Sequence, residues 1–278
     1  MIPDGDTNKV YFSYCSTYDF KPELKRLRTI IKQYGFTYGH IAGTKDYFCR
    51  DYMPIQLSKD EFVQFKFQPD YLLNNPELKG YVTNTTDVFK KNEFFEAKKI
   101  HHSEIILDGG NIIKSNNAVI ITDKVVYDNN ISGEEIKSKL EELLKVKVII
   151  IPRYPDEETG HADGLIRFLD ENTVLIINLE NEEKDWSEKF LKILSENGLN
   201  VISLPKGNSP KHDWRYLNYL QIGKMVIVPE FDNGSNEIIL PFLKDLFEKY
   251  RLKMETLNSE KIAEEGGVLN CFTWNILE

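Results

Sequence analysis

With 278 residues, of which 41% are hydrophobic, the chain is long enough to bury a substantial core, and its apolar content excludes a disordered protein. Its formal net charge of −9 argues against nucleic acid as a partner, because phosphate binding depends on clustered Lys and Arg. The longest apolar runs are strand-sized and the first residues do not resemble a signal sequence, so we expect neither membrane insertion nor secretion.

The secondary structure predicted along the chain alternates between strands and helices in one α/β domain, 1–278. Amphipathic spacing after Pro, Ser or acidic residues predicts four helices, which begin at Lys21, Ser132, Asn181 and Ser235. Runs of β-branched residues predict strands at 9–15, 61–67, 103–107, 118–126, 147–152, 172–179, 199–205, 224–231 and 271–276. The simplest description is a strand-strand-helix-strand unit of about fifty residues that is repeated four or five times. The polar segment 69–101 does not fit this unit, and we expect a long loop or an irregular module there.

The three cysteines, Cys15, Cys49 and Cys271, are widely separated and odd in number. This spacing makes neither a disulfide framework nor a C-x-x-C metal site. We therefore expect a cytoplasmic protein, and we assign it no metal and no cofactor. The sequence does not predict the oligomeric state.

Cys271 follows a Gly-Gly pair in "EEGGVLNC". A free cysteine is most often a small buried hydrophobe, but adjacent glycines allow the close backbone approach that reactive sites use. A second acid-Gly-Gly element occurs in "ILDGGNII", which begins at Ile106. The two elements suggest a repeated structural device near a common centre.

The stretch "TGHADGLIRF" places His161 and Asp163 two residues apart, so on a strand both side chains face the same way. An imidazole and a carboxylate on one face make a compact acid/base unit. The alternative is a surface loop with two polar residues. A metal site is less favoured, because His-x-Asp supplies two ligands and no matching third is evident.

In "DYFCRDYMPIQ", Arg50 and Asp51 lie in an otherwise apolar stretch before Pro54. One interpretation is a turn with a buried Arg-Asp ion pair, and the other is that Asp51 presents its carboxylate to a cationic ligand. A thiol, an imidazole and two carboxylates suit a planar cation: the carboxylates accept paired N–H groups of a guanidinium while sulfur adds to its central carbon.

Five motifs, "RDYMP", "DGGN", "GHADGLIRF", "YLNYLQIGKMVIVPEFD" and "EEGGVLNC", occur in the order found in a known family. Over nearly its whole length the chain resembles the agmatine deiminase and bacterial-type peptidylarginine deiminase family of the guanidino-group modifying superfamily. This resemblance implies the pentein fold, a five-bladed α/β propeller of ββαβ modules. The chain differs from the family pattern at Met53, where glycine is usual, and at Asn270, where histidine is usual.

The resemblance also implies the roles of individual residues. Cys271 is the expected nucleophile, His161 the general acid/base, and Asp51 and Asp163 the carboxylates that hold the guanidinium. Asn218 is expected to line the site. The predicted set of substrate-binding residues is Asp51, Asp163, Asn218 and Arg50. We assign His101, His102, His212 and Asp108 to structure.

The implied reaction is deimination of a small guanidino compound or an arginine side chain. A Cys271 thiolate, expected to form beside a protonated His161, attacks the guanidinium carbon. Ammonia leaves, and water converts the covalent intermediate to a ureido product. Two alternatives remain open: an amidinotransferase, in which an amine replaces water, and a non-catalytic pentein that binds a partner.

Overall fold

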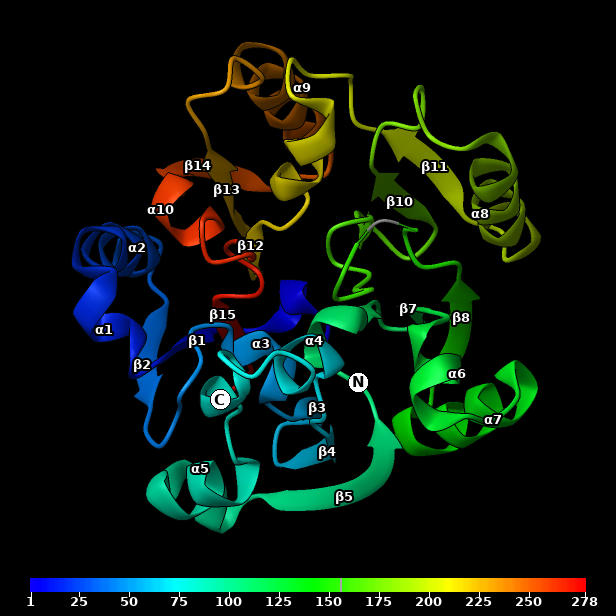
Figure 1. Cartoon of the computed structure of the whole chain (residues 1–278). Helices are drawn as coiled ribbons and strands as arrows, with labels where there is room; N and C mark the ends of the chain where they lie inside the picture. Colours follow the sequence, from blue (N-terminus) through cyan, green and yellow to red (C-terminus); the bar gives the residue numbers. More distant parts are fainter. Residues whose placement is uncertain (156) are drawn as a thin grey trace.

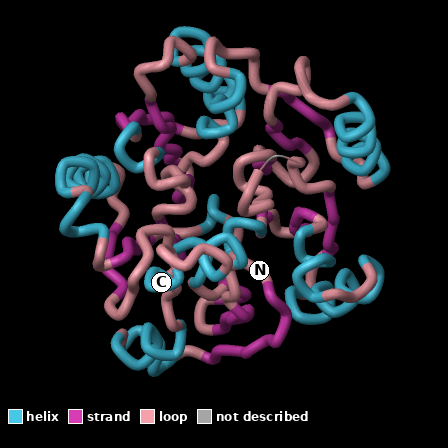
Figure 2. Tube along the Cα trace, in the orientation of Figure 1, coloured by secondary structure: helices cyan, strands magenta, loops and turns pink. Residues whose placement is uncertain are grey.

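The computed structural model describes residues 1–155 and 157–278, which form five three-stranded sheets arranged around a central axis (Figure 1). In every sheet the central strand pairs antiparallel with one neighbour and parallel with the other. The longer helices lie at the periphery of the ring (Figure 2). The five-bladed α/β propeller predicted from the family resemblance is confirmed.

The strands group by sheet as follows: β15 (Thr273–Ile276), β1 (Lys9–Ser13) and β2 (Thr37–Ile41); β3 (Ile55–Ser58), β4 (Glu61–Lys66) and β5 (Lys99–Ile106); β6 (Ile113–Lys114), β7 (Ala118–Thr122) and β8 (Lys147–Ile151); β9 (Ile166–Phe168), β10 (Thr173–Ile176) and β11 (Asn200–Ser203); β12 (Leu220–Ile222), β13 (Met225–Glu230) and β14 (Lys253–Asn258). The α-helices are α1 (Ser16–Asp19), α2 (Lys21–Gln33), α3 (Cys49–Tyr52), α4 (Asp70–Leu73), α5 (Thr85–Lys91), α6 (Lys124–Asn129), α7 (Gly133–Leu144), α8 (Lys184–Glu196), α9 (Asn236–Lys249) and α10 (Glu260–Ala263). The 3₁₀ helices are η1 (Asp4–Asp6), η2 (Lys79–Tyr81), η3 (Glu93–Ala97), η4 (Gly109–Asn111) and η5 (Pro210–Tyr216).

Helix α7 shows why these sequences form peripheral helices. The Ser132 side chain accepts a hydrogen bond from the Glu135 backbone N–H at 3.2 Å, so it caps the first turn. Ile136, Leu140 and Leu144 recur at helical spacing and are all buried against the sheet side, whereas the opposite face stays polar. The four predicted helices are all present and each connects the parallel strands of its sheet.

One predicted strand is confirmed only in its first part. The run 118–126 is split, because β7 ends at Thr122 and α6 begins at Lys124. Lys124 pairs with Asp128 one helical turn later, at 3.1 Å, and with Asp70 of α4 at 2.7 Å. These two ion pairs favour a helix over the β propensity of the valines that follow.

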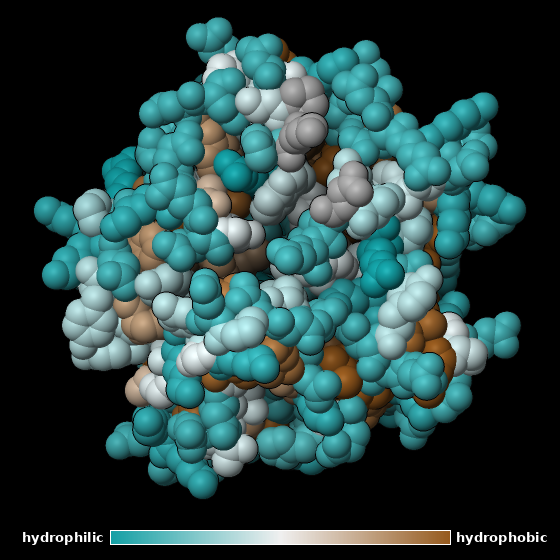
Figure 3. Space-filling view, in the orientation of Figure 1, coloured by the Kyte–Doolittle hydropathy of each residue, from teal (hydrophilic) through white to brown (hydrophobic). Residues whose placement is uncertain are grey.

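The segment 69–101 contains α4, η2, α5, η3 and the start of β5, so it is an irregular module between β4 and β5, as expected. Its first part lies near the axis of the propeller, where α4 is visible beside α3 (Figure 1). The space-filling view shows the same face hollowed near its centre (Figure 3). None of the described helices is long and apolar enough to cross a bilayer.

Candidate active site

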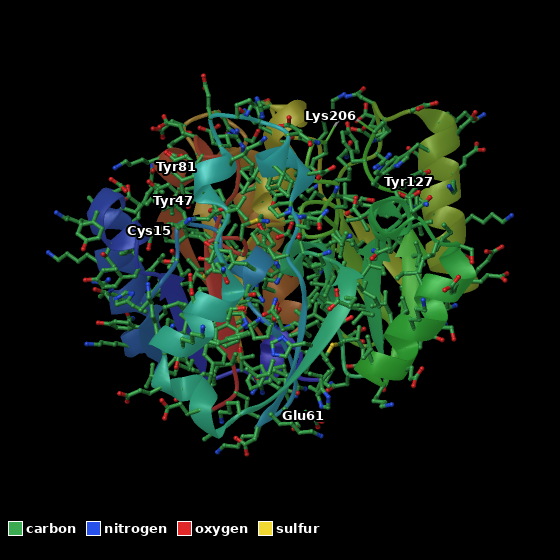
Figure 4. All side chains as sticks on the ribbon, turned by 60° about the horizontal axis from the view of Figure 1, so that its bottom comes forward. Cys15, Tyr47, Glu61, Tyr81, Tyr127 and Lys206 are labelled. Atoms are coloured by element: carbon green, nitrogen blue, oxygen red, sulfur yellow. The ribbon has the colours of Figure 1, made fainter. Side chains whose placement is uncertain are left out.

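A cavity of about 700 Å³ is lined by residues from several blades, among them Cys271, His161, Asp51 and Asp163. The structure therefore brings together the four residues that the sequence singled out for chemistry. Each has at most 9% of its surface exposed, so the chemical groups lie at the buried end of the cavity. Farther out, the cavity wall includes Tyr47, Tyr81 and Lys206, which Figure 4 places toward one end of the molecule, opposite Glu61.

Cys271 lies two residues before β15, and its sulfur is held between two side chains. The Sγ atom is 3.2 Å from Asp163 Oδ2 and 3.1 Å from Asn218 Nδ2. The other amide atom of Asn218, Oδ1, accepts hydrogen bonds from the backbone N–H groups of Asn270 and Cys271, at 3.0 and 3.2 Å. The expectation that Asn218 lines the cavity is wrong, because the residue is fully buried and is not part of the cavity wall. Its hydrogen bonds instead hold the thiol and the nucleophile loop, residues 264–272 between α10 and β15.

His161 lies between two carboxylates. Its Nε2 is 3.1 Å from Asp108 Oδ2 and its Nδ1 is 3.7 Å from Asp51 Oδ1. Burial lowers the pKa of His161, but the carboxylates of Asp51 and Asp108 outweigh burial and raise the pKa to about 10. The imidazole is therefore protonated at neutral pH and can donate a proton.

The glycines of "DGGN" allow the acid and the imidazole to meet. The Gly110 backbone N–H donates to Asp51 Oδ1 at 3.0 Å, and its carbonyl accepts from the Asp163 N–H at 3.1 Å. A Cβ at Gly110 would lie 2.5 Å from Asp51 Oδ1 and 2.6 Å from His161 Nδ1, closer than real Cβ contacts. Only glycine fits, and its backbone links both candidate guanidinium carboxylates.

The electrostatics of the thiol correct one expectation. Burial and the nearby carboxylates of Asp163 and Asp51 raise the pKa of Cys271 well above its ordinary value. Burial likewise raises the pKa of Asp51, although His161 opposes this shift. The expectation of a thiolate is therefore corrected, because burial and the acidic neighbours favour the neutral thiol in the empty site.

Asp108 is a residue that sequence reasoning missed. The sequence predicts a structural role for it, yet one carboxylate oxygen contacts His161 and the other, Oδ1, is buried without a hydrogen-bond partner among the described residues. Its position directly before the two glycines was the available signal. His212 also differs from its assignment, because it lines the outer cavity, whereas His101 pairs with Glu61 at 2.6 Å on the surface.

Arg50, like Asn218, is a predicted substrate-binding residue that does not line this cavity. Its Nε donates to the Asn270 carbonyl at 3.2 Å, and its Nη2 donates to Asn275 Oδ1. No ion pair with Asp51 is present among the described residues, so the buried Arg-Asp pair is also wrong. Successive residues of the short helix α3 point in different directions, so Asp51 faces the cavity while Arg50 points behind the nucleophile loop.

The outer cavity is aromatic and acidic. Tyr47, Phe48, Tyr81, Tyr154 and Trp214 contribute rings. Acidic side chains come from Asp46, Glu157, Glu158, Glu182, Asp213 and Glu265. Burial raises the pKa of Asp46 to about 6. Residues 1–155 and 157–278 contain no group of three or more His, Cys, Asp or Glu side chains that could hold a metal ion.

Comparison with known proteins places this geometry in a family. The family model of Porphyromonas-type peptidyl-arginine deiminases matches residues 20–276. The chain belongs to this family. The residues of the buried cluster all lie in motifs that this family shares: Asp51 in "RDYMP", Asp108 in "DGGN", His161 and Asp163 in "GHADGLIRF", and Cys271 in "EEGGVLNC".

Two curated relatives of this deiminase-family chain are 22% identical to it. They are a putative agmatine deiminase of Lactococcus lactis subsp. lactis, aligned over 209 residues, and an agmatine deiminase of Pseudomonas aeruginosa, aligned over 210 residues. Each alignment covers 61% of the chain, and the chain spans 57% and 56% of the two relatives. A solved structure of a C. jejuni agmatine deiminase variant with substrate bound has a TM-score of 0.75 at 17% identity, with 100% of this chain and 96% of that one covered. This likeness shows the fold.

Proposed function

We propose that the chain is a cysteine hydrolase that removes ammonia from a guanidino compound. The observation that carries the proposal is the buried thiol of Cys271, 3.2 Å from the Asp163 carboxylate, in a cavity where a second carboxylate, Asp51, contacts a charged imidazole. Two carboxylates beside a nucleophile suit a guanidinium, whose N–H groups pair with carboxylate oxygens and whose carbon then faces the sulfur.

Substrate binding activates the nucleophile in this proposal. The guanidinium offsets the negative charges of Asp51 and Asp163, which raise the pKa of Cys271 in the empty site, so the thiol releases its proton to solvent and becomes a thiolate. The sulfur forms a bond to the guanidinium carbon and gives a tetrahedral adduct. His161 donates its proton to one amino group, the C–N bond breaks, and ammonia leaves.

The second half of the reaction restores the enzyme. His161, now neutral, takes a proton from a water molecule that attacks the same carbon. The C–S bond then breaks, the hydroxyl proton of the adduct passes to the sulfur, and the guanidine has become a ureido group, while His161 keeps the proton that it took from water. Asp108 keeps the imidazole aligned through both proton transfers, because its carboxylate contacts Nε2 at 3.1 Å.

The outer cavity supports a cationic substrate tail. Among the described lining residues the acids outnumber the single lysine, Lys206, which itself pairs with Glu180 at 3.2 Å. A free amino acid would bring a carboxylate toward these acids, whereas an amine tail would be attracted to them. We therefore propose an agmatine-like substrate in preference to free arginine, in keeping with the agmatine deiminases among the relatives.

Ammonia release from agmatine, free arginine and an arginine-containing peptide tests the proposal. We expect release from agmatine at least tenfold faster than from arginine, and none from the Cys271→Ser variant. Release from arginine or peptide alone contradicts the substrate class. If no compound releases ammonia, the same mixtures are assayed with an amine acceptor, and amidino transfer or complete silence then overturns the hydrolase proposal.

A further inference from the structure

A second cavity, of about 150 Å³, lies behind the nucleophile loop and shares no lining residue with the active-site cavity. Its wall includes η1, the stretch 112–116, the stretch 167–171, Arg50 and Asn270. Asn270 immediately precedes Cys271, so the two cavities border the same loop at neighbouring residues.

Three cations converge in this second cavity. The side chains of Arg50, Lys114 and Arg167 are only 4%, 5% and 4% exposed. The carboxylate of Asp4, in η1, forms ion pairs with all three. It lies 2.9 Å from Lys114 Nζ, 3.2 Å from Arg167 Nη2 and 3.9 Å from Arg50 Nη1. The buried part of the cavity therefore has three positive charges against one negative charge.

The other acids of the cavity wall do not balance this charge. Asp6 and Asp170 are exposed to solvent, where salt screens them. Glu171 accepts hydrogen bonds from the backbone N–H groups of Asn116 and Asn117, both at 3.2 Å, at the surface of the molecule. Buried charges are screened much less, so the excess positive charge is felt mainly inside the cavity.

The two arginines have neutral partners besides Asp4. Arg167 donates to the carbonyls of Leu217 and Tyr219, at 3.4 and 2.9 Å, and its guanidinium lies 4.2 Å from the centre of the Tyr219 ring. Arg50 donates to Asn270 and Asn275. These contacts satisfy N–H groups but supply no charge, so burial of the cluster remains costly without a further anion.

We propose that this second cavity binds a small inorganic anion between Arg50, Lys114 and Arg167. Its volume of about 150 Å³ exceeds that of a halide or a tetrahedral oxyanion with a water molecule, and it excludes large organic anions. The anion offsets the charge that Asp4 leaves uncompensated. The anion also contacts Arg50, which holds the nucleophile loop by two hydrogen bonds. The Arg50 Nε donates to the Asn270 carbonyl, and its backbone N–H donates to the Cys271 carbonyl.

The test measures the thermal unfolding midpoint of the full chain while chloride, sulfate or phosphate replaces gluconate at constant ionic strength. Gluconate is too large for the cavity and serves as the reference anion. Lys114→Met removes one buried cation, and Lys192→Met, with a side chain 73% exposed on α8, is its matched control. Asp4→Asn removes the competing carboxylate. Chloride-35 NMR line broadening measures binding to the wild type directly.

Lys114→Met and Asp4→Asn should change the affinity for the anion in opposite directions. For at least one of the three anions we expect a saturable rise of the midpoint in the wild type, an apparent Kd at least tenfold weaker in Lys114→Met, and one at least tenfold tighter in Asp4→Asn. The Lys192→Met variant should match the wild type. Equal responses in all four proteins indicate a general salt effect and overturn the proposal. If the variants do not fold, absence of saturable stabilisation and of NMR broadening in the wild type overturns it equally.

Discussion

Replacing Asp163 by asparagine should have opposite effects on turnover and on thiol reactivity. The carboxylate lies 3.2 Å from Cys271 Sγ and accepts a hydrogen bond from Asn270 Nδ2 at 2.8 Å. An amide at this position can keep the bond from Asn270 because it retains one oxygen. Asp163→Asn therefore removes the negative charge and largely preserves the shape of the site.

The magnitude follows from the charge that is lost. Breaking a buried ion pair by removing one partner costs about 3–5 kcal/mol, so kcat/KM should fall roughly 100-fold to several thousand-fold. In the empty enzyme the same carboxylate raises the pKa of Cys271. Its removal lowers that pKa, so iodoacetamide should alkylate Cys271 faster in Asp163→Asn than in the wild type.

Two assays on the same preparations check this pair of effects. Ammonia release gives kcat/KM, and peptide mass spectrometry after timed alkylation gives the labelling rate of each cysteine. Cys49 is fully buried and serves as the internal control. Unchanged turnover would refute the role of Asp163 in binding the cation. Slower labelling together with reduced turnover would refute the reasoning about thiol protonation.

Three further predictions concern the same site. Gly110→Ala should reduce kcat at least 100-fold, because the new methyl group would lie 2.5 Å from Asp51 Oδ1, whereas Gly80→Ala, with no atom within 4 Å, should leave kcat unchanged. Asp108→Asn should lower the pKa of His161, so the loss of activity at high pH should begin at a lower pH; an unshifted pH profile would show that Asp108 does not act through the imidazole. The raised pKa of His161 contributes stability that is fully present below about pH 6.5 and is lost as the pH rises toward about 10. The free energy of unfolding in urea should therefore decline less over this range in His161→Gln than in the wild type.

The repeated architecture could be predicted from the sequence because four of the five blades combine a long amphipathic helix with a buried strand, whereas the blade of β3, β4 and β5 has the irregular module in place of such a helix. Helices α2, α7, α8 and α9 have apolar residues at helical spacing, and β7 and β10 are entirely buried. The strands that escaped prediction all lie at sheet edges: β2, β3, β6, β9, β12 and β14. Strand β6 has two residues and β12 has three, so their pairing depends on neighbouring strands and not on their own composition.

The residue types of the site could be predicted from the motifs, but side-chain directions could not. Asp51 and Arg50 are neighbours in sequence, and only the packing of α3 against η4 and the nucleophile loop decides which one reaches the cavity. The protonation of Cys271 could not be predicted from the sequence for a related reason. It depends on carboxylates 108 and 220 positions away in sequence, whose distances to the sulfur are set by the folded propeller.

The pairing of β15 with β1 closes the propeller by joining Lys9 to Ile276. Such a contact spans almost the whole chain, and closing so long a loop is entropically costly, so we expect ring closure to be a late step in folding. Because Cys271 lies two residues before β15, separation of this one seam would remove the thiol from Asp163 while the other four blades stay formed. Inactivation by mild denaturant should then precede loss of the bulk secondary structure.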